Sequence, residues 1–436
     1  MSTKINKIKI LFALLITAFI VSCNDNEAEQ IFEDSTTVRK QKREQELRNL
    51  LKGSPDGWKV TYFTDNDILG GYTFLFKFLD DSSVEMASDF TNEYTTAISE
   101  YDILFSSTTK LSFTTKNKIH DLSDSNNAPD AGLRGRGYKG DFEFLYYGTD
   151  GEDIIFRTNR DFIELRFKKA TAQDWVDLSK HEPMKSNIAV QVGKSVFRTL
   201  KVGDKLYNFS YNANRRFATN TDDSNGNLNF GIGFTPTGIT IDPALDVNGE
   251  KISEFIYDAT EDKFVASLNG SEVASIFYAS TPAFPFTGYE DINRTGLAYN
   301  EYPGETVETN QAFQDFLANY RQNLTNSGIT LRFFQFQEME NNAGWFRIGI
   351  AYNGNNINLW FDFTMSVVDN KLIFTRGSNG PHPSWEPFMK PLTDIIFDPQ
   401  GHFVKNAGSM DQFNNAIFTL IPASFTQYLM EFYAFG

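Results

Sequence analysis

Arg376, His382, Trp385 and Glu386 are the residues of this chain best suited to bind a ligand, because they combine charge, an imidazole and an indole within one short segment. The segment, Arg376–Phe388, contains two glycines and three prolines, which favour a stiff loop. Loops on rigid β scaffolds commonly carry recognition, and an aromatic ring can stack on a sugar face while polar neighbours fix hydroxyls. The sequence therefore predicts a binding loop for a glycan or peptide. The alternative is that Trp385 packs beneath the loop as part of the core.

Cys23 is the only cysteine of the 436 residues. It ends the run Ile20-Val21-Ser22-Cys23, which follows three lysines and an apolar stretch, and this order is typical of a signal peptide. The apolar stretch, Ile10–Val21, is shorter than the roughly 20 residues that span a bilayer as a helix. Residues 20–23 resemble the bacterial lipobox, in which the cysteine thiol receives lipid. We expect residues 1–22 to be a lipoprotein signal peptide and lipid on Cys23 to hold the protein on a membrane. The alternative is an ordinary cysteine near a conventional secretory cleavage site.

Residues 23–34 form an acidic tether with five acidic residues and no basic one. Self-repulsion extends such a segment, and acidic residues directly after the cysteine resemble the surface-export signal of Bacteroidota lipoproteins. The signal peptide carries three lysines and no acid, so its removal takes the formal net charge from −16 to −19. This charge excludes nucleic acid as a partner. An anionic membrane face would also repel the chain, so the lipid must anchor it.

The sequence contains no familiar catalytic or metal-binding motif. Its four histidines lack the spacing of a zinc site: His120, His181, His382 and His402. A Gly-x-Ser-x-Gly nucleophile elbow does not occur. The polar run Asp222–Asn227 lacks the first carboxylate and the final glutamate of a calcium loop. We therefore expect no cofactor, while an active site assembled across the fold stays open.

The segment Gly132–Gly140 contains four glycines and three cationic residues, as a phosphate cradle would. A phosphate cradle, however, leads into the N-terminus of a helix. This segment leads into an expected strand, Phe142–Tyr147. We therefore interpret it as a flexible connection between strands.

The composition, with 42 Phe and 18 Tyr, indicates a β-rich chain, because aromatic residues fit a pleated, half-buried surface. We predict a mainly β fold with a few short helices, built from antiparallel β-sandwich or barrel-like domains that are each preceded by a helix. Apolar or alternating runs predict strands at 58–63, 72–78, 142–147, 154–157, 162–167, 206–211, 229–234, 252–257, 264–268 and 329–336.

Two stretches have the apolar periodicity of a helix. The first begins at Asp34 or Ser35 and ends at Gly53, and the second lies in residues 305–326. Their apolar sides consist of Val38, Leu47, Leu50 and Leu51 in the first helix and Phe313, Phe316, Leu317, Tyr320 and Leu324 in the second.

These patterns divide the exported chain into three regions: an N-terminal helix with a β-meander (35–182), a second β-rich domain (187–282), and a C-terminal helix with a β region (305–436). The first and last regions share the order helix, glycine and strand, which allows an internal duplication. The alternative is that a helix followed by a hairpin is simply common supersecondary structure.

The N-terminal residues resemble a known family. Ile31-Phe32, Gly57-Trp58, Gly71–Phe74 and Gly137–Phe144 are similar to the Bacteroidota lipoprotein family described as domain of unknown function 4302. The resemblance covers roughly residues 23–280. It implies a genomic context beside TonB-dependent outer-membrane importers and their substrate-binding lipoproteins, and it supplies no activity and no site residues.

From the anchor and this resemblance we expect a lipid-anchored envelope protein in the outer membrane, facing the surface. Its expected role is that of an accessory or ligand-binding lipoprotein of a nutrient-uptake system, with the importer and its substrate-binding lipoprotein as partners. Two alternatives stay open: a hydrolase that acts on glycans or peptides through a dispersed active site, and a structural envelope protein.

Overall fold

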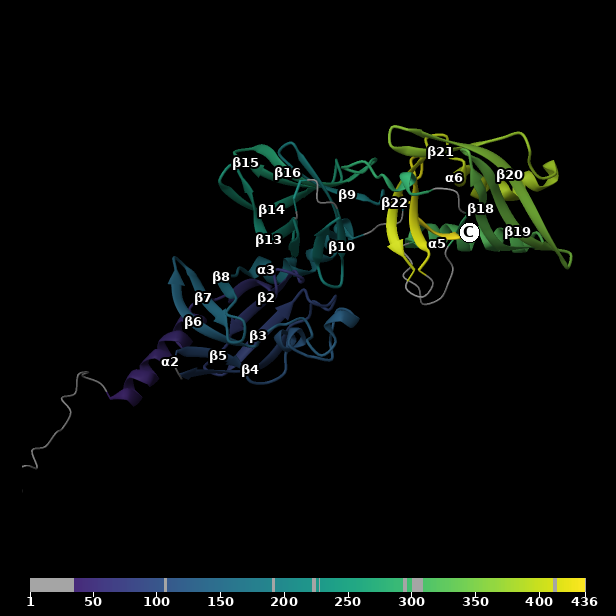
Figure 1. Cartoon of the computed structure of the whole chain (residues 1–436). Coiled ribbons are helices and arrows are strands. Elements are labelled where there is room, and N and C mark those ends of the chain that lie inside the picture. Colours follow the sequence, from purple (N-terminus) through teal and green to yellow (C-terminus); the bar gives the residue numbers. More distant parts are fainter. Residues whose placement is uncertain are drawn as a thin grey trace, which may run out of the picture.

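The computed structural model of the chain describes residues 35–105, 108–189, 193–221, 225–226, 228–292, 296–299, 309–410 and 414–435. The expected signal peptide and tether, with Cys23, lie outside the described residues. The strands form three closed antiparallel barrels of eight strands each, in which consecutive strands pair and the last strand closes on the first. This confirms the mainly β fold and gives it a barrel form. Figure 1 shows the barrels following one another in chain order.

In β1 and β7 of the first barrel, buried side chains alternate with partly exposed ones, as expected for strands with one wet face, whereas β2 is buried along almost its whole length. It closes through β1 and β8, with Trp58 paired to Lys169. Its strands are β1 Trp58–Phe63, β2 Gly71–Phe78, β3 Ser83–Ser88, β4 Ala97–Phe105, β5 Thr109–Phe113, β6 Glu143–Asp150, β7 Asp153–Thr158 and β8 Glu164–Lys169.

The second barrel has short turns with left-handed residues. Asn248 and Gly249, and again Asn269 and Gly270, have positive φ angles at hairpin ends, where such turns match the twist of the strands. Its strands are β9 Phe197–Val202, β10 Lys205–Asn212, β11 Phe217–Asn220, β12 Phe230–Thr235, β13 Gly238–Val247, β14 Glu250–Asp258, β15 Lys263–Leu268 and β16 Ser271–Ala279.

The third barrel contains the longest strands. Its first strand, β17, pairs with both β18 and β24. This strand precedes helix α5 (Gln311–Asn326) in the chain, so the prediction that a helix precedes each β domain is wrong for the third barrel. Its strands are β17 Gly296–Tyr299, β18 Ile329–Glu340, β19 Ala343–Tyr352, β20 Asn355–Val368, β21 Lys371–Arg376, β22 His402–Ser409, β23 Ala416–Pro422 and β24 Met430–Phe435.

Each barrel core is completed by helical residues. Leu47 and Leu51 join the first core, and Met184 and Ile188 join the second. The α-helices are α2 Thr36–Lys52, α3 Ala172–Asp177, α4 His181–Ile188, α5 Gln311–Asn326 and α6 Glu386–Ile396. The 3-10 helices are η1 Lys118–Leu122, η2 Ala131–Leu133, η3 Leu178–Lys180, η4 Gly288–Glu290 and η5 Pro383–Trp385. Among the described residues, none of the helices combines the length and apolarity needed to cross a bilayer.

Helix α2 begins and ends near the expected residues. The Ser35 hydroxyl accepts from the Val38 amide at 3.3 Å, and Gly53 is the C-terminal cap. The indole of Trp58 donates to the Leu51 carbonyl at 2.7 Å and fixes the end of the helix on β1. Val38, expected on the apolar side, is instead 45% exposed. The helix therefore packs on the barrel through its C-terminal half.

Candidate functional site

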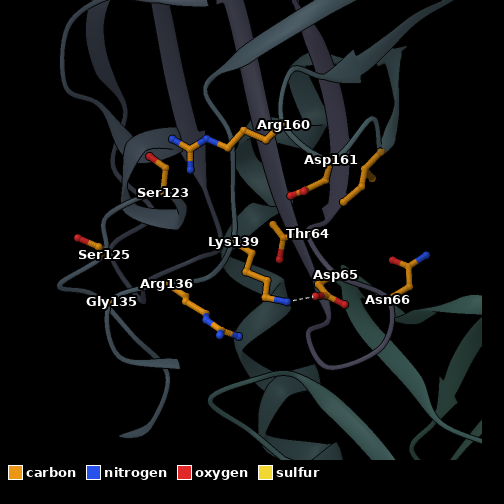
Figure 2. Close-up of a pocket in the computed structure, with 11 residues that line it drawn as sticks. Thr64, Asp65, Asn66, Ser123, Ser125, Gly135, Arg136, Lys139, Arg160 and Asp161 are labelled. Carbon is orange, nitrogen blue, oxygen red and sulfur yellow. Dashed lines mark hydrogen bonds and ion pairs between the residues drawn. The ribbon is translucent and has the colours of Figure 1, made fainter. Parts of the chain in front are cut away.

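A polar cavity of about 710 Å³ opens at one end of the first barrel (Figure 2). The loops that follow β1, β5 and β7 form it. Because neighbouring strands run in opposite directions, these loops leave the barrel at the same end. The lining residues are Thr64, Asp65, Asn66, Ser123, Ser125, Gly135, Arg136, Lys139, Arg160, Asp161 and Ile163.

The charged lining of this cavity consists of three cations and two carboxylates. Lys139 forms an ion pair with Asp65, drawn as the dashed line in Figure 2. Arg136 and Arg160 have no ion-pair partner within the described part of the chain. Both are exposed and can therefore bind an anion without first breaking a bond. In a chain with a formal net charge of −16, such a cluster is a local site of positive potential.

Thr64 carries a buried hydroxyl that lacks a partner. The residue is 1% exposed, and its Oγ1 has no hydrogen-bond partner among the described residues. Figure 2 places Thr64 in the middle of the cavity, between Lys139 and Asp161. A buried polar group without a hydrogen bond costs roughly 1–3 kcal/mol. Because Thr64 lines the cavity, a small shift of its side chain would let the hydroxyl bond a molecule that enters.

Asp141 holds the loops of the cavity together. It is 3% exposed. Its Oδ2 accepts from the backbone amides of Asn159 at 2.9 Å and Arg160 at 3.0 Å. Its own amide donates to the hydroxyl of Tyr62 at 3.1 Å, and burial raises the pKa of that phenol well above its ordinary value. The loop that carries Arg160 is thus fixed to the strand that follows the glycine-rich segment.

The glycine-rich segment is pinned rather than flexible, which corrects the interpretation drawn from the sequence. The amides of Tyr138 and Gly140 donate to the Leu122 carbonyl at 3.1 and 3.0 Å. A Cβ on Gly137, whose φ is +59°, would lie 2.5 Å from the Asp124 carbonyl oxygen. The glycines therefore allow a close approach of two backbone segments. As expected, the segment leads into a strand and not into a helix.

The segment expected to be a binding loop is helical only in its second half. Pro383–Trp385 forms η5, and Glu386 begins α6, because the prolines stand at first-turn positions where the missing amide costs nothing. Trp385 is half-buried and meets Tyr352 edge to face at 5.4 Å. His382 is exposed, and its Nδ1 bonds the Ser384 hydroxyl at 2.9 Å.

The structure brings Arg376 and Glu386 together. Two hydrogen bonds of 2.6 and 2.9 Å join their side chains, and the Arg376 guanidinium lies 4.8 Å from the ring centre of Phe361. This pairing lowers the pKa of Glu386 and raises that of Arg376. The two charges satisfy each other, although both side chains keep about a third of their surface exposed. Trp385 packs against the core of the third barrel, as the alternative interpretation of the sequence proposed. The role of Trp385 and His382 in binding stays a prediction.

His120 and His402 hold local backbone rather than a ligand. His120 Nδ1 accepts from the Asn117 amide at 3.1 Å, and His402 Nε2 bonds the Ile395 carbonyl at 3.2 Å. Among the described residues, no three His, Cys, Asp or Glu side chains are grouped so that they could hold a metal ion. Residues 222–224 and 227 of the calcium-like run lie outside the described residues.

The cavity was missed from the sequence because its residues come from three separate loops. The one signal was the cationic cluster Arg134, Arg136 and Lys139 in a strongly acidic chain. Nothing in the spacing connects this cluster to Thr64 or Arg160.

Comparison with known proteins supports a family but no activity. No curated protein matches the sequence. Among solved structures, a DNA polymerase sliding clamp from Bacillus subtilis aligns over 90% of this chain and 98% of the clamp, at 9% identity and a TM-score of 0.16, too low to carry an argument. The family model described as "Domain of unknown function (DUF4302)" matches residues 28–259, which include the first barrel and strands β9 to β14 of the second. Because this match spans more than half of the 436 residues, the chain belongs to the DUF4302 family.

Proposed function

We propose that this protein is a lipid-anchored, surface-facing lipoprotein of the outer membrane that captures a ligand for a nutrient-uptake system. The ligand of the first barrel is a small hydroxylated anion, such as a sugar acid. The observation that carries this proposal is the cavity, whose lining includes the Thr64 hydroxyl, which lacks a partner, and Arg136 and Arg160, which have no ion-pair partner within the described residues.

The cavity matches an acidic sugar in both charge and hydrogen bonding. A carboxylate is bound well by guanidinium groups, which present several donors in one plane. Sugar hydroxyls can bond Thr64, Ser125 and the Asp161 carboxylate, because each offers an acceptor or a donor. Asp65 is already held by Lys139, so its negative charge is balanced before a ligand enters.

Binding is a better match than hydrolysis for this site. None of the four histidines lines the cavity, and the Ser123 hydroxyl donates to the His120 carbonyl, which is not a base. A hydrolase is the second candidate, since Asp65 and Asp161 share one cavity, and glycosidases use pairs of carboxylates. Release of reducing ends from glycans would favour it.

The envelope location rests on Cys23 and on the family resemblance. The importer and its substrate-binding lipoprotein are the partners that the resemblance suggests. Mass spectrometry of the mature N-terminus tests the anchor. Acylated Cys23 is the expected result, and an unmodified N-terminus further downstream would contradict it.

Calorimetry tests the ligand class. The full chain, purified in detergent, is titrated with glucuronate, galacturonate, glucose and inorganic phosphate. We expect the uronates to bind and glucose to bind at least tenfold more weakly. Arg160→Gln and Thr64→Val should each weaken uronate binding about tenfold to hundredfold, since a hydrogen bond to a charged group contributes roughly 1.5–3 kcal/mol.

Arg134→Gln is the matched control. Arg134 lies on the same glycine-rich segment, is exposed, and does not line the cavity, so its loss should leave uronate binding unchanged. Equal affinity for glucose and the uronates, or full affinity in Arg160→Gln, would contradict the proposal.

A further inference from the structure

The outer surface of the third barrel carries partly exposed aromatic side chains on β18, β19 and β20. On β19, Trp345 and Arg347 alternate with the buried residues Phe346 and Ile348 and therefore point away from the core. Arg347 lies opposite Trp360 of β20 in the sheet register. Trp345 and Trp360 are both partly exposed.

These side chains form one continuous row across β18, β19 and β20. The Arg347 guanidinium lies 4.8 Å from the ring centre of Phe333 and 5.1 Å from that of Trp360. Trp360 in turn meets Trp345 at 6.2 Å, with the rings perpendicular. We call Phe333, Arg347, Trp360 and Trp345 the aromatic row.

Gly349 lets the row lie close to the sheet. It pairs with Phe333 in the register, and a Cβ at this position would come within 2.3 Å of the Phe333 ring. The Phe333 ring therefore lies against the backbone of β19 instead of projecting away from the sheet. Any other residue at this position would push Phe333 away from Arg347.

The tryptophans of the row differ from those that serve the fold. Trp58 and Trp175 donate their indole N–H groups to the carbonyls of Leu51 and Asp56, at 2.7 and 2.8 Å. The N–H groups of Trp345 and Trp360 have no acceptor in the described ranges. Partly exposed tryptophan with a free donor is typical of binding surfaces, because the residue presents an apolar face and a polar edge.

We propose that the aromatic row binds a neutral polysaccharide, which is a second binding activity in addition to the capture of an anion by the first barrel. A sugar ring offers an apolar face of C–H groups for stacking, with hydroxyls around its edge. The side-chain amides of Gln335 and Gln337 lie opposite Arg347 and Trp345 on the same outer face and can donate to and accept from such hydroxyls.

The charges around the row are of both signs and favour a ligand without charge: Arg332 lies 5.8 Å from the ring centre of Phe333, at the other end of the row from Asp362. Asp362 lies opposite Trp345, and its carboxylate is held by the backbone and side-chain N–H groups of Asn379 at 2.9 Å each. This negative group would repel an anionic polysaccharide. Arg347, the one cation of the row, lies between two rings. The two rings therefore cover its guanidinium, which is not a free site for a carboxylate.

The location of the row suits an extended ligand. The third barrel lies at the opposite end of the molecule from α2, which follows the N-terminal segment (Figure 1). It also lies outside the residues that the family model matches. A barrel at this end can contact a polymer that stays outside the cell while the first barrel receives a smaller ligand.

Affinity electrophoresis of the full chain through gels that contain a neutral glucan, mannan or xylan tests the proposal. At least one of the three should retard the protein. Trp360→Ala and Trp345→Ala should each weaken this binding about tenfold to hundredfold, by analogy with the loss of one stacked base from an aromatic side chain. Trp360→Tyr, which keeps a ring and a donor, should restore part of it.

Two control variants and a thermal melt separate binding by the row from binding elsewhere on the chain. Tyr147→Ala removes an aromatic residue that is 50% exposed on the first barrel and should not change retardation. Arg160→Gln should also leave it unchanged, so failure of the anion site and failure of the row are distinguishable. Thermal melts should show that Trp360→Ala keeps its fold.

The proposal is overturned if none of the three polysaccharides retards the wild-type chain, or if both tryptophan variants bind as tightly as the wild type. If Trp385→Ala abolishes retardation and Trp360→Ala does not, the polysaccharide binds around Trp385 and not at the aromatic row. Dimers that dissociate in Trp360→Ala, without polysaccharide binding, would show that the row is covered by a second copy.

Discussion

The two junctions between barrels are built from opposite chemistry. The ionic junction, between the first and second barrels, consists of Asp89, His181 and Arg216, each at most 5% exposed as a side chain. The apolar junction, between the second and third barrels, consists of Phe197, Phe403 and Ile421. A buried ion pair demands one geometry, whereas apolar contacts tolerate small shifts. The first two barrels are thus joined in a specific orientation, and the third is joined more permissively.

The ionic junction satisfies every oxygen of Asp89. Its Oδ1 accepts from Arg216 and from the Thr73 amide, both at 2.9 Å, and its Oδ2 bonds His181 Nδ1 at 2.8 Å. Burial alone would raise the pKa of Asp89, but Arg216 and the hydrogen bond from His181 hold it well below its ordinary value. Arg216 also lies 4.5 Å from the ring centre of Tyr72. The charge is therefore retained although it is buried.

The apolar junction is simpler. Phe197 meets Phe403 edge to face at 5.1 Å, and the Val196 amide donates to the Thr426 carbonyl at 2.8 Å. The one ammonium group recorded against these rings in the described residues is that of Lys371, 5.9 Å from the ring centre of Phe403, and it forms no ion pair there. The strength of the junction therefore follows from the apolar area that it covers.

Arg216→Ala should destabilise the protein more than any other single substitution at the two junctions. Removal of one partner leaves a buried carboxylate uncompensated, and this destabilises a protein by roughly 3–5 kcal/mol. Urea unfolding followed by circular dichroism measures the loss. The matched control is Arg215→Ala. Arg215 pairs with Asp130 across the same junction with about 30% of both side chains exposed, so its loss should cost about 0–1 kcal/mol. Equal losses in the two variants would show that burial of the Arg216–Asp89 pair does not make it more important than an exposed pair.

As the pH is lowered, the apolar junction should lose stability before the ionic junction does. Phe403 is preceded by His402, whose burial lowers its pKa to about 4 against the opposing field of Asp398. Between pH 6.5 and 4 the unfolded chain binds a proton that the folded chain does not, so stability falls as the pH falls, by about 3 kcal/mol in total. Asp89 affects stability at a lower pH than His402. Because its pKa is depressed in the folded protein, its ionised carboxylate contributes stability that is complete above the ordinary aspartate pKa and is lost only as the pH falls below that value.

Hydrogen exchange at pH 7 and pH 4.5 can follow the two sides separately. Peptides of β22 should lose protection at pH 4.5, while peptides of β2 and β12 keep theirs. His402→Gln should remove the pH dependence of β22. If β2 and β12 open first, the predicted order is wrong.

The sequence predicted several strands that are rich in apolar residues, but it missed both polar strands and apolar ones such as β23. β1, β2, β7 and β8 follow the expected runs closely because aromatic and branched residues mark them. Ser83–Ser88 was not predicted, since its apolar residues do not outnumber its serines and glutamate, and pairing with β2 and β4 makes it a strand. Barrel closure also depends on pairs far apart in the chain, such as Trp58 with Lys169, which local patterns do not encode.

The candidate site shows the same limit. Arg376, His382, Trp385 and Glu386 were found because they are close in sequence, and two of them proved to satisfy each other. The cavity residues come from loops that only barrel closure brings together. In the ionic junction, Arg216 and Asp89 are separated by 127 positions. The sequence around either residue does not predict that the two form an ion pair.

Phe403→Leu should have the smallest effect, and it tests whether the apolar junction tolerates change. Leucine is apolar but smaller than phenylalanine, so the junction must close a small gap, which should cost less than about 1.5 kcal/mol if the neighbours repack. The edge-to-face contact with Phe197 would be lost, which removes roughly 0.5–1.5 kcal/mol beyond simple burial. We therefore expect a loss of about 1 kcal/mol and faster exchange of the Val196 amide, whose hydrogen bond to Thr426 spans this junction. Exchange in β2 and β12 should not change, because these strands meet at the ionic junction. A loss as large as that of Arg216→Ala would mean that the apolar junction is as demanding in its geometry as the ionic one.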